Sequence, residues 1–301
     1  MRIRTLAAAL LAGGLLLTAC GKEGAPAGSG GDANTNAAAL PTYEVAKDVK
    51  LDGSPVFTKI KSAGTITIGV KDDQPELGQK DPKTGKFQGF DIEIARMVAA
   101  GLGFSEDKIK YTTVDSAARE QAISNGQVDL YVGTYTISDK RKKLVSFAGP
   151  YFQAGQDLLV RKDDNSITGP ETLKGKKVCS VTGSTPIQRV REQKLTDQIV
   201  EFQKYSQCVE KLSTKDVDAV TTDDAILKGY AAQDPDSFKV VGKPFSKEPY
   251  GIGLNKDDKV LRDKIDDLLQ AAETNGTWKK IYDATLGKSG APATPPAIER
   301  Y

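Results

Sequence analysis

Thr134, Thr136 and Arg141 stand close together in the stretch GTYTISDKRKK, residues 133–143. The two hydroxyl side chains lie two positions apart, so on an extended chain they share one face. Arg141 follows within a basic run, and its guanidinium can hold a carboxylate through two parallel hydrogen bonds. The preceding segment GQVDLYVG predicts a buried strand that ends at these residues. The pattern indicates a strand end that binds an anion, unless Arg141 is only one charge of a solvated run.

A second group of this kind lies at TGSTP, residues 182–186, where a loop opens onto a predicted helix. Pro186 suits the first turn of a helix, and the free backbone N–H groups there suit a carboxylate. Ser184 and Thr185 are therefore candidate ligand residues. The alternative for both is an ordinary helix cap.

Length, charge and composition limit the classes of protein. A chain of 301 residues is long enough for two domains, and 42 basic against 40 acidic residues leave a net charge of +2. This balance predicts no nucleic-acid partner. Histidine is absent, which excludes histidine-based triads, histidine-ligated metals and a histidine pH switch. We expect neither a metal nor a cofactor, although enzymes using Asp, Glu, Lys or Cys chemistry are not excluded.

The N-terminus, MRIRTLAAALLAGGLLLTACGKEG, predicts export. It carries two arginines, an apolar run from Leu6 to Leu17 and small residues up to Cys20. The run is too short for an ordinary membrane span, so it indicates a secretory signal. LLTAC followed by glycine resembles a bacterial lipobox, in which the cysteine is diacylated; the alternative is a plain secretory signal. We expect a signal peptide at 1–19, a lipid on Cys20 and a location on the outer face of the cell membrane. Residues 20–54 are then a flexible tether.

Export changes the meaning of the two remaining cysteines, Cys179 and Cys208. In an oxidising compartment a disulfide is the default, and two buried free thiols are the alternative. Closing a loop of roughly 30 residues stabilises the fold by about 3–4 kcal/mol in the chain-entropy model. The spacing and the count exclude a redox CxxC pair and a zinc cluster.

From about residue 55 the sequence alternates short β-rich runs with helical ones. Strands are predicted at 64–70, 108–114 and 128–133, with helices at 89–103, where Asp91 is a plausible N-cap, and 116–127. The same order returns later, with a strand and a loop within 173–185, strands at 199–203 and 217–224, and helices at 186–194, 205–216 and 224–233. Alternating strands and helices predict two α/β lobes with largely parallel sheets.

A late strand at 249–255 and a helix at 259–283 follow a stretch that looks like a crossing back to the first lobe. We therefore expect lobe 1 at 55–152 and 244–288, lobe 2 at 153–243, and a Pro/Ala-rich tail at 289–301. Two crossings form a hinge, and ligands favour domain interfaces and the carboxyl ends of parallel strands.

From roughly residue 55 to 285 the chain resembles the polar-amino-acid family of ABC-transporter solute-binding proteins. The resemblance rests on GTITIGVK, GFDIEIA, NGQVDLYVGTYTISDKRKKLVSFAGPYF, LKGKKVCSVTGST, VDAVTTDDA and NGTWKKIYD in this order. It is greatest to the glutamate-binding lipoproteins of Gram-positive importers. The resemblance implies an α/β periplasmic-binding-protein-like clamshell, which closes on a free amino acid and delivers it to a membrane permease.

The resemblance also implies the roles of single residues. Arg141, with the hydroxyl pair Thr134 and Thr136, matches the α-carboxylate site, and Asp223 matches the aspartate that binds the α-ammonium. If the register is shifted by one, Asp224 takes that role.

Lys71 and Arg119, with Ser116 one turn earlier, lie where an anionic ligand side chain is held; a surface lysine and a helix-face arginine are the alternatives. Tyr205 falls where a related acidic-amino-acid binder has a pocket histidine, but core packing explains it equally well. The family often stacks an aromatic residue on the ligand, and DDQPELG, residues 72–78, provides none.

We therefore expect a monomer that binds L-glutamate and is not an enzyme. The alternative ligands are aspartate, glutamine or several polar amino acids. An enzyme similar to cyclohexadienyl dehydratase is a further alternative, although the sequence shows no glutamate in the second lobe beside the cleft loop. The third class of protein considered is a sensor module, which would need a separate partner protein.

Overall fold

The structure is a computed structural model that describes residues 39–289 and 293–301. The predicted signal peptide, Cys20 and the first part of the predicted tether lie outside the described residues. None of the helices in these ranges is long and apolar enough to cross a membrane.

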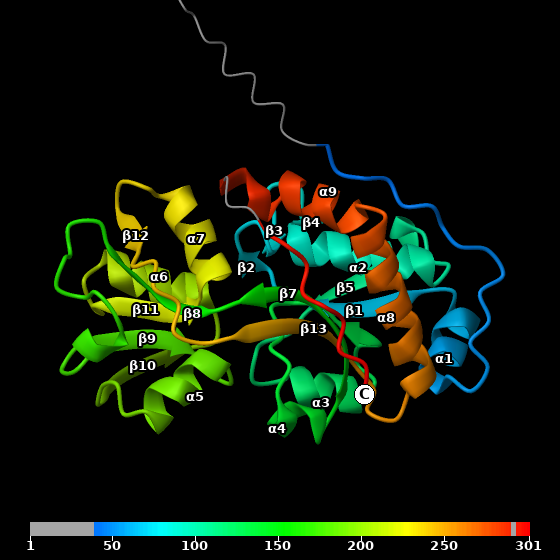
Figure 1. The fold of residues 1–301 in the computed structure, drawn as a ribbon, viewed down its shortest axis with the longest axis horizontal. Helices are drawn as coiled ribbons and strands as arrows, with labels where there is room; N and C mark the ends of the chain where they lie inside the picture. Colours follow the sequence, from blue (N-terminus) through cyan, green and yellow to red (C-terminus); the bar gives the residue numbers. More distant parts are fainter. Residues whose placement is uncertain (1–38, 290–292) are drawn as a thin grey trace, which may run out of the picture. The chain divides into compact units, whose positions relative to one another are not determined.

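Two five-stranded sheets form the centres of two lobes (Figure 1). The sheet of lobe 1 has the order β5 (Ile109–Thr113), β1 (Ile66–Val70), β6 (Leu130–Tyr131), β13 (Glu248–Leu254) and β7 (Ser146–Ala154). The sheet of lobe 2 has the order β10 (Gln198–Phe202), β9 (Lys177–Val181), β11 (Ala219–Asp223), β8 (Gln156–Arg161) and β12 (Phe238–Val240). In lobe 1, β1 pairs in parallel with β5 and β6, and β13 pairs antiparallel with β6 and β7. In lobe 2, β9 pairs in parallel with β10 and β11, and β8 pairs antiparallel with β11 and β12.

The helices cover the faces of these sheets. Lobe 1 carries α1 (Pro55–Ala63), α2 (Phe90–Gly101), α3 (Arg119–Ser124), α4 (Asp139–Lys142), α8 (Lys259–Thr274), α9 (Thr277–Ala284) and the 3-10 turns η1 (Glu106–Lys108) and η3 (Leu286–Ser289). It also has a small sheet of β2 (Asp73–Gln74), β3 (Gly78–Lys80) and β4 (Phe87–Gln88). Lobe 2 carries η2 (Pro170–Thr172), α5 (Thr185–Glu192), α6 (Tyr205–Ser213) and α7 (Asp224–Gln233).

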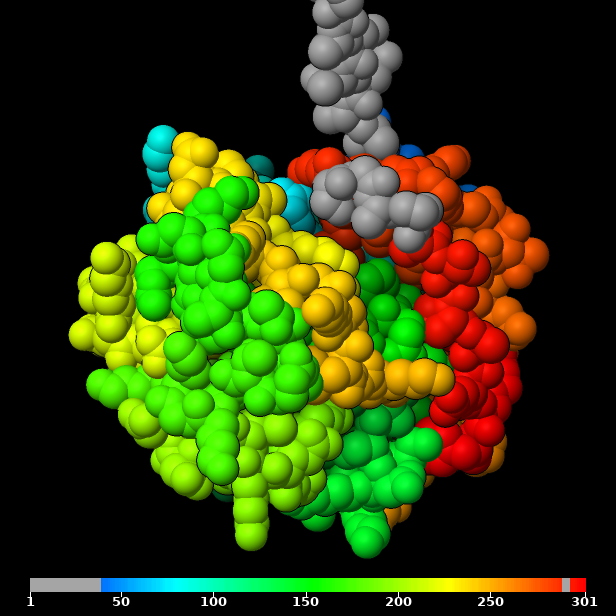
Figure 2. Space-filling view, turned by 60° about the vertical axis from the view of Figure 1, so that its left-hand side comes forward, coloured from blue at the N-terminus to red at the C-terminus, as the bar shows by residue number. Residues whose placement is uncertain are grey.

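The chain crosses between the lobes twice. It leaves β7 for β8 through Gly155, and it returns from β12 to β13 through residues 241–247. The two crossings are bonded to each other, since Phe245 N donates to Gln156 O at 2.8 Å. A Cβ on Gly155 would lie 2.8 Å from Ser246 O, so this close approach requires glycine. Figure 2 shows the return crossing, in gold, on the surface between the lobes.

Two predicted helices differ from the structure. The predicted helix at 259–283 is two helices, because Gly276 takes φ +80 between α8 and α9. Asp91 is not the N-cap of α2. Gly89 precedes that helix with φ +116, and Asp91 is buried in the first turn.

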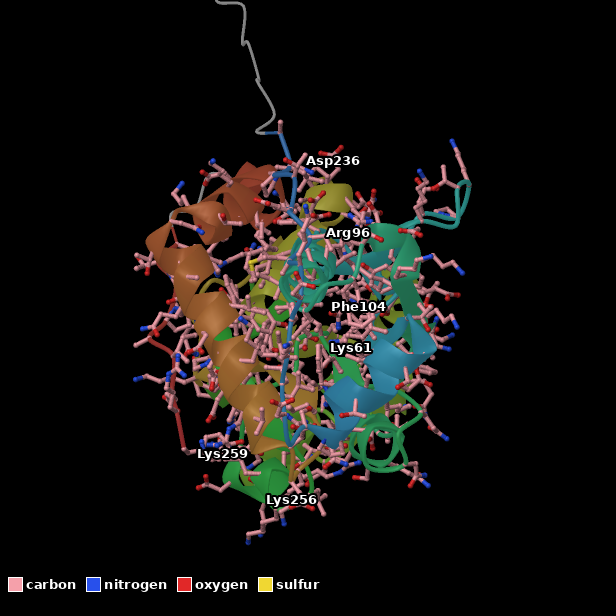
Figure 3. The ribbon with its side chains drawn as sticks, turned by 90° about the vertical axis from the view of Figure 1, so that its right-hand side faces the viewer. Lys61, Arg96, Phe104, Asp236, Lys256 and Lys259 are labelled. Carbon is pink, nitrogen blue, oxygen red and sulfur yellow. A yellow bond between two sulfur atoms is a disulfide. The ribbon has the colours of Figure 1, made fainter. Side chains whose placement is uncertain are left out.

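The described parts of the predicted tether and tail pack on lobe 1. Tyr43 Oη donates to Glu93 Oε2 at 2.8 Å, and Ala46 N donates to Ala100 O at 2.9 Å. In Figure 3 the N-terminal segment, in blue, runs along the side of lobe 1 that carries Arg96 and Phe104. At the other end, Tyr301 Oη accepts from Phe147 N at 2.8 Å. Residues 43–54 and 293–301 therefore contact lobe 1 in the structure, in the ranges that the sequence analysis assigned to the end of the tether and to the tail.

Candidate ligand-binding site

The predicted ligand residues meet in one polar cavity between the lobes. All of them except Lys71 line a cavity of about 10 Å³, which is formed by Ser116, Arg119, Thr134, Thr136 and Arg141 of lobe 1 and by Ser184, Thr185, Pro186, Tyr205, Asp223 and Ile226 of lobe 2. This volume holds roughly one water molecule. The lobes are therefore closed on each other, and an amino acid can enter only when they separate.

Thr134 follows β6, and its backbone takes the left-handed conformation, which is unusual for a threonine. Thr134 has φ +45, and its N–H donates to the carboxylate of Asp91 at 2.9 Å. Its hydroxyl donates to Gln74 Oε1 at 3.1 Å, and Tyr151 Oη donates to the second oxygen of Asp91 at 2.8 Å. Burial raises the pKa of Asp91 to about 6. Asp91 and Gln74 thus hold this loop, and neither was predicted to do so, although Asp91 lies in the recognised phrase GFDIEIA.

Arg141 is not a solvated member of the DKRKK run, since it is only 5% exposed while Lys140 and Lys143 are exposed. Its Nη1 donates to Thr136 O at 2.8 Å, and its Nη2 reaches Gly183 O of lobe 2 at 3.2 Å. Burial lowers the pKa of the guanidinium to about 10, with a further contribution from Arg119, so it stays charged at neutral pH. The position suits a cation that holds a carboxylate at the cleft.

Asp223, at the carboxyl end of β11, supplies the opposite charge from lobe 2. Its Oδ2 accepts from Tyr250 Oη at 2.7 Å, while its Oδ1 is buried without a hydrogen-bond partner among the described residues. Burial, followed by the charge of Glu248, raises the pKa of Asp223 to about 8. The structure places Asp224 outside the cavity, where it pairs with Lys228 at 2.5 Å. Asp223 is therefore the aspartate available to an ammonium group.

Two buried cations lie at Ser116: Arg119 lines the cavity, and Lys71, which does not line it, contacts the Ser116 side chain. Lys71 follows β1, and its Nζ donates to Ser116 Oγ at 2.9 Å and Val114 O at 3.2 Å. Arg119 donates to Ser116 O at 3.1 Å and Gly183 O at 3.4 Å, and its guanidinium lies 4.4 Å from the ring centroid of Tyr135.

These partners are neutral, and no carboxylate within the described ranges forms an ion pair with Lys71 or Arg119. Burial, followed by the charge of Arg119, lowers the pKa of Lys71 to about 7. Two desolvated cations that form no direct ion pair are costly, although Asp73, Asp115 and Asp72 attract Lys71 from nearby, and an anionic group next to both cations would relieve that cost.

The second-lobe loop combines a cap with cavity contacts. Ser184 caps α5, because its hydroxyl accepts from Ile187 N at 3.3 Å, and it also lines the cavity. Thr185 Oγ1 lies 3.4 Å from Thr136 Oγ1 across the cleft. Tyr205 lines the cavity and also belongs to the hydrophobic core. The structure therefore allows both of its predicted roles, ligand contact and core packing.

A glutamate does lie beside this loop, but it comes from lobe 1, so the expectation that lobe 2 supplies none there is not contradicted. Glu248 comes from the first position of β13, and its Oε2 accepts from Thr185 Oγ1 at 2.7 Å. Its partner Arg189 on α5 forms an ion pair with it at 2.8 Å. The contact was missed because it joins residues 63 positions apart.

The predicted disulfide between Cys179 and Cys208 is confirmed. It ties β9 to α6, the helix that begins at Tyr205. Neither sulfur lines the cavity, so the bond supports lobe 2 without contacting a ligand there.

A larger cavity of about 170 Å³ lies between α7 and the turn η3. Phe152, Ala225 and Leu286 give it a mainly apolar lining. Its charged lining residues already pair with each other, Lys228 with Asp224 and Lys288 with Glu76, so the smaller polar cavity is the better site for a zwitterion. Among the residues that the structure describes, no group of three His, Cys, Asp or Glu side chains could hold a metal ion.

Two α/β lobes with cations and a carboxylate converging between them define a receptor for a small charged solute. The family model of the bacterial extracellular solute-binding proteins, family 3, matches residues 66–288, and the chain belongs to this family.

The chain is 41% identical over 235 residues to the glutamate-binding protein GluB of Corynebacterium efficiens, covering 75% of this chain and 80% of that protein. It is 37% identical to the ABC transporter glutamine-binding protein GlnH of Bacillus subtilis, covering 93% and 96%. A solved structure of an ancestral arginine-binding protein bound to arginine superposes with a TM-score of 0.69 at 37% identity, covering 73% of this chain and 97% of that one.

Proposed function

We propose that this protein captures L-glutamate between its lobes and delivers it to the permease of an ABC importer. Its family makes it an amino-acid solute-binding protein of an ABC transporter. The choice of glutamate is the further step, since the relatives include both glutamate- and glutamine-binding proteins.

One observation carries the choice of glutamate: Lys71 and Arg119 are both buried at one end of the site, and their hydrogen-bond partners are neutral oxygens. Among the predicted ligand residues, the cations Lys71, Arg119 and Arg141 stand against the carboxyl group of Asp223, and Arg141 also forms an ion pair with Glu120 at 3.2 Å. Glutamate brings two carboxylates and one ammonium, which complements this set. Glutamine would leave Lys71 and Arg119 facing a neutral amide, which forfeits a charge-assisted contact of about 1.5–3 kcal/mol.

Calorimetric titration of the purified chain, beginning after Cys20, against the twenty amino acids tests the ligand. Glutamate should bind tightest. Glutamine should bind at least tenfold more weakly, because about 1.4 kcal/mol corresponds to a factor of ten. Aspartate keeps the charge but is one methylene shorter, so it should be the closest competitor. Tighter binding of glutamine or arginine would show that the side-chain end of the site is wrongly assigned.

We further infer that the protein is held on the outer face of the cell membrane by a lipid on Cys20. The support is the arginine-flanked apolar run and the LLTAC–Gly sequence at residues 16–21. A diacylglyceryl group carries two chains, which suffices for stable anchoring. Cys20→Ala should release the protein into the medium, and full retention in the membrane fraction would refute the anchor.

A further inference from the structure

Tyr135 lies between two threonines of the site along the chain, but its side chain does not join them in the cavity. Thr134 and Thr136 line the cavity, whereas Tyr135 is 0% exposed and belongs to a small hydrophobic cluster of lobe 1. Its ring packs on Tyr131 and Phe147, with ring centroids 5.2 and 4.7 Å apart. The ring of Tyr135 is therefore fixed by packing within lobe 1.

Both arginines of the site lie over this ring. The guanidinium carbon of Arg119 is 4.4 Å from the ring centroid of Tyr135, and that of Arg141 is 5.0 Å from it. A cation over the face of an aromatic ring, within about 6 Å of the centroid, is attracted by the partial negative charge on that face. One buried ring thus attracts both guanidinium groups.

The two guanidinium groups repel each other. Both donate to Gly183 O, at 3.4 and 3.2 Å, and the charge of Arg119 is one of the causes that lower the pKa of Arg141. Gly183 belongs to lobe 2, so both arginines lose this carbonyl when the lobes separate. Tyr135 belongs to lobe 1, as both arginines do, so its ring can hold them in the open state as well.

Each arginine also has a lobe 1 partner of its own. Arg119 Nε donates to Ser116 O at 3.1 Å, and Arg141 Nη1 donates to Thr136 O at 2.8 Å. The Nε of Arg141 lies 3.2 Å from the carboxylate of Glu120. Each of these contacts restrains one guanidinium group, whereas the aromatic ring restrains both.

We propose that Tyr135 is a positioning residue whose ring holds the guanidinium groups of Arg119 and Arg141 in place for the ligand while the lobes are open. Cations that are already held in place lose less conformational freedom when a ligand binds, and such preorganisation raises affinity. The inference rests on the proposed function in one respect, which is that Arg119 meets the side-chain carboxylate of glutamate. The contact of Arg141 with an α-carboxylate does not depend on which amino acid is bound.

A series of substitutions that weakens the charge on the ring face but keeps the ring tests the proposal. In the mature protein, Tyr135→Phe is compared with the same variant carrying one, two and three ring fluorines, and glutamate binding is measured by calorimetry. Fluorine withdraws negative charge from the ring face, so the Kd should rise with each fluorine, by at least fivefold over the series.

The matched control is the same fluorinated series at Phe147. Phe147 packs on the Tyr135 ring, and no cation lies over its own ring in the part of the chain that the structure describes. This series should change the Kd by less than twofold. A constant Kd over the series at residue 135, or an equal rise in the control series, would overturn the proposal.

A second comparison removes the ring altogether. Tyr135→Leu should bind glutamate at least tenfold more weakly than Tyr135→Phe, and Phe147→Leu, in the same cluster, should change the Kd less than threefold. Because the ring holds both cations, the loss in Tyr135→Leu should be at least threefold smaller for glutamine, which has one carboxylate. Equal binding of glutamate by the leucine and phenylalanine variants at residue 135 would refute the role of the ring, and equal losses for the two ligands would refute its role at Arg119.

The two proposals fail separately. A parent protein that prefers another amino acid refutes the choice of glutamate, and the fluorinated series is then measured with that ligand. A parent that prefers glutamate, together with a constant Kd over the series, refutes only the role of Tyr135. If Tyr135→Leu does not fold, the fluorinated series still decides, because it leaves the aromatic ring in place.

Discussion

The carboxylate of Asp72 in lobe 1 accepts two hydrogen bonds, of 2.7 and 3.0 Å, from Lys204 Nζ in lobe 2. Next to this pair, Asp73 accepts from Ser206 N at 3.1 Å and from Tyr230 Oη. The lobes also approach closely here, since a Cβ on Gly229 would lie 2.6 Å from the carbonyl oxygen of Pro75. The closed state is therefore held at a second place, outside the ligand cavity.

Removing the Asp72–Lys204 contact should weaken ligand binding, because it stabilises only the closed lobes. The pair is partly exposed, so its contribution is of the order of 0.2–1 kcal/mol and is screened by salt. We expect Lys204→Met to raise the Kd for glutamate by about two- to fivefold at low salt and by less at high salt. Lys211→Met is the matched control, since Lys211 pairs with Asp216 within lobe 2. Equal affinities for both variants in calorimetry at low salt would exclude a role in closure.

Arg141 should be essential for binding the α-carboxylate. Truncating one partner of a desolvated charged contact costs about 2–5 kcal/mol, which is tens- to thousands-fold in Kd. Arg141→Met should show this loss for every amino acid that binds. Lys140→Met removes the neighbouring exposed charge and should leave the Kd nearly as in the parent. An Arg141→Met variant that binds glutamate normally would disprove the assignment.

The preference for glutamate over glutamine should fall as the pH rises. In the ligand-free protein the pKa of Lys71 is lowered to about 7, and a bound side-chain carboxylate favours the charged amine. Above pH 7, glutamate binding must therefore take up a proton, which costs up to about tenfold in affinity per pH unit. Asp223, with a pKa raised to about 8, gives up a proton to receive the ammonium, but this affects both ligands alike.

The ratio of the two Kd values, measured from pH 6 to 9, isolates the contribution of Lys71. In the parent the ratio should change mainly above pH 7. In Lys71→Met it should be smaller and nearly independent of pH. A parent ratio that stays constant over this range would contradict a role for Lys71 at the ligand side chain.

The disulfide should stabilise lobe 2 against unfolding. Cys179 and Cys208 are 29 positions apart, and closing such a loop is worth about 3–4 kcal/mol in the chain-entropy model. The Cys179→Ser/Cys208→Ser variant should therefore unfold at a lower urea concentration, with a somewhat larger m-value because the unfolded chain without the cross-link exposes more surface. The parent treated with a reductant provides the comparison without a sequence change. An unchanged midpoint in both cases would show that the bond does not contribute to stability.

The sequence by itself determined the repeated strand–helix order, and with it most of the site. The carboxyl ends of parallel strands meet at one edge of a sheet, so Lys71 after β1 and Thr134 after β6 could be predicted as neighbours, while Asp223 ends a strand of the second sheet and faces them only across the two lobes. The family resemblance added the roles of the single residues, including the α-ammonium role of Asp223 and the side-chain role of Arg119. The disulfide followed from two cysteines and an exported chain.

Only the tertiary structure decided which residues support that site. Asp91 and Gln74 bind Thr134 across 43 and 60 positions, and Glu248 binds Thr185 across 63. Periodicity and capping patterns describe neighbours within a few residues, so they say nothing about such pairs. Asp91 even matched a helix-cap pattern, which is a local alternative for the same side chain. Its buried place between Thr134 and Tyr151 exists only once α2, β6 and β7 have packed together, because burial depends on the whole lobe and not on the adjacent sequence.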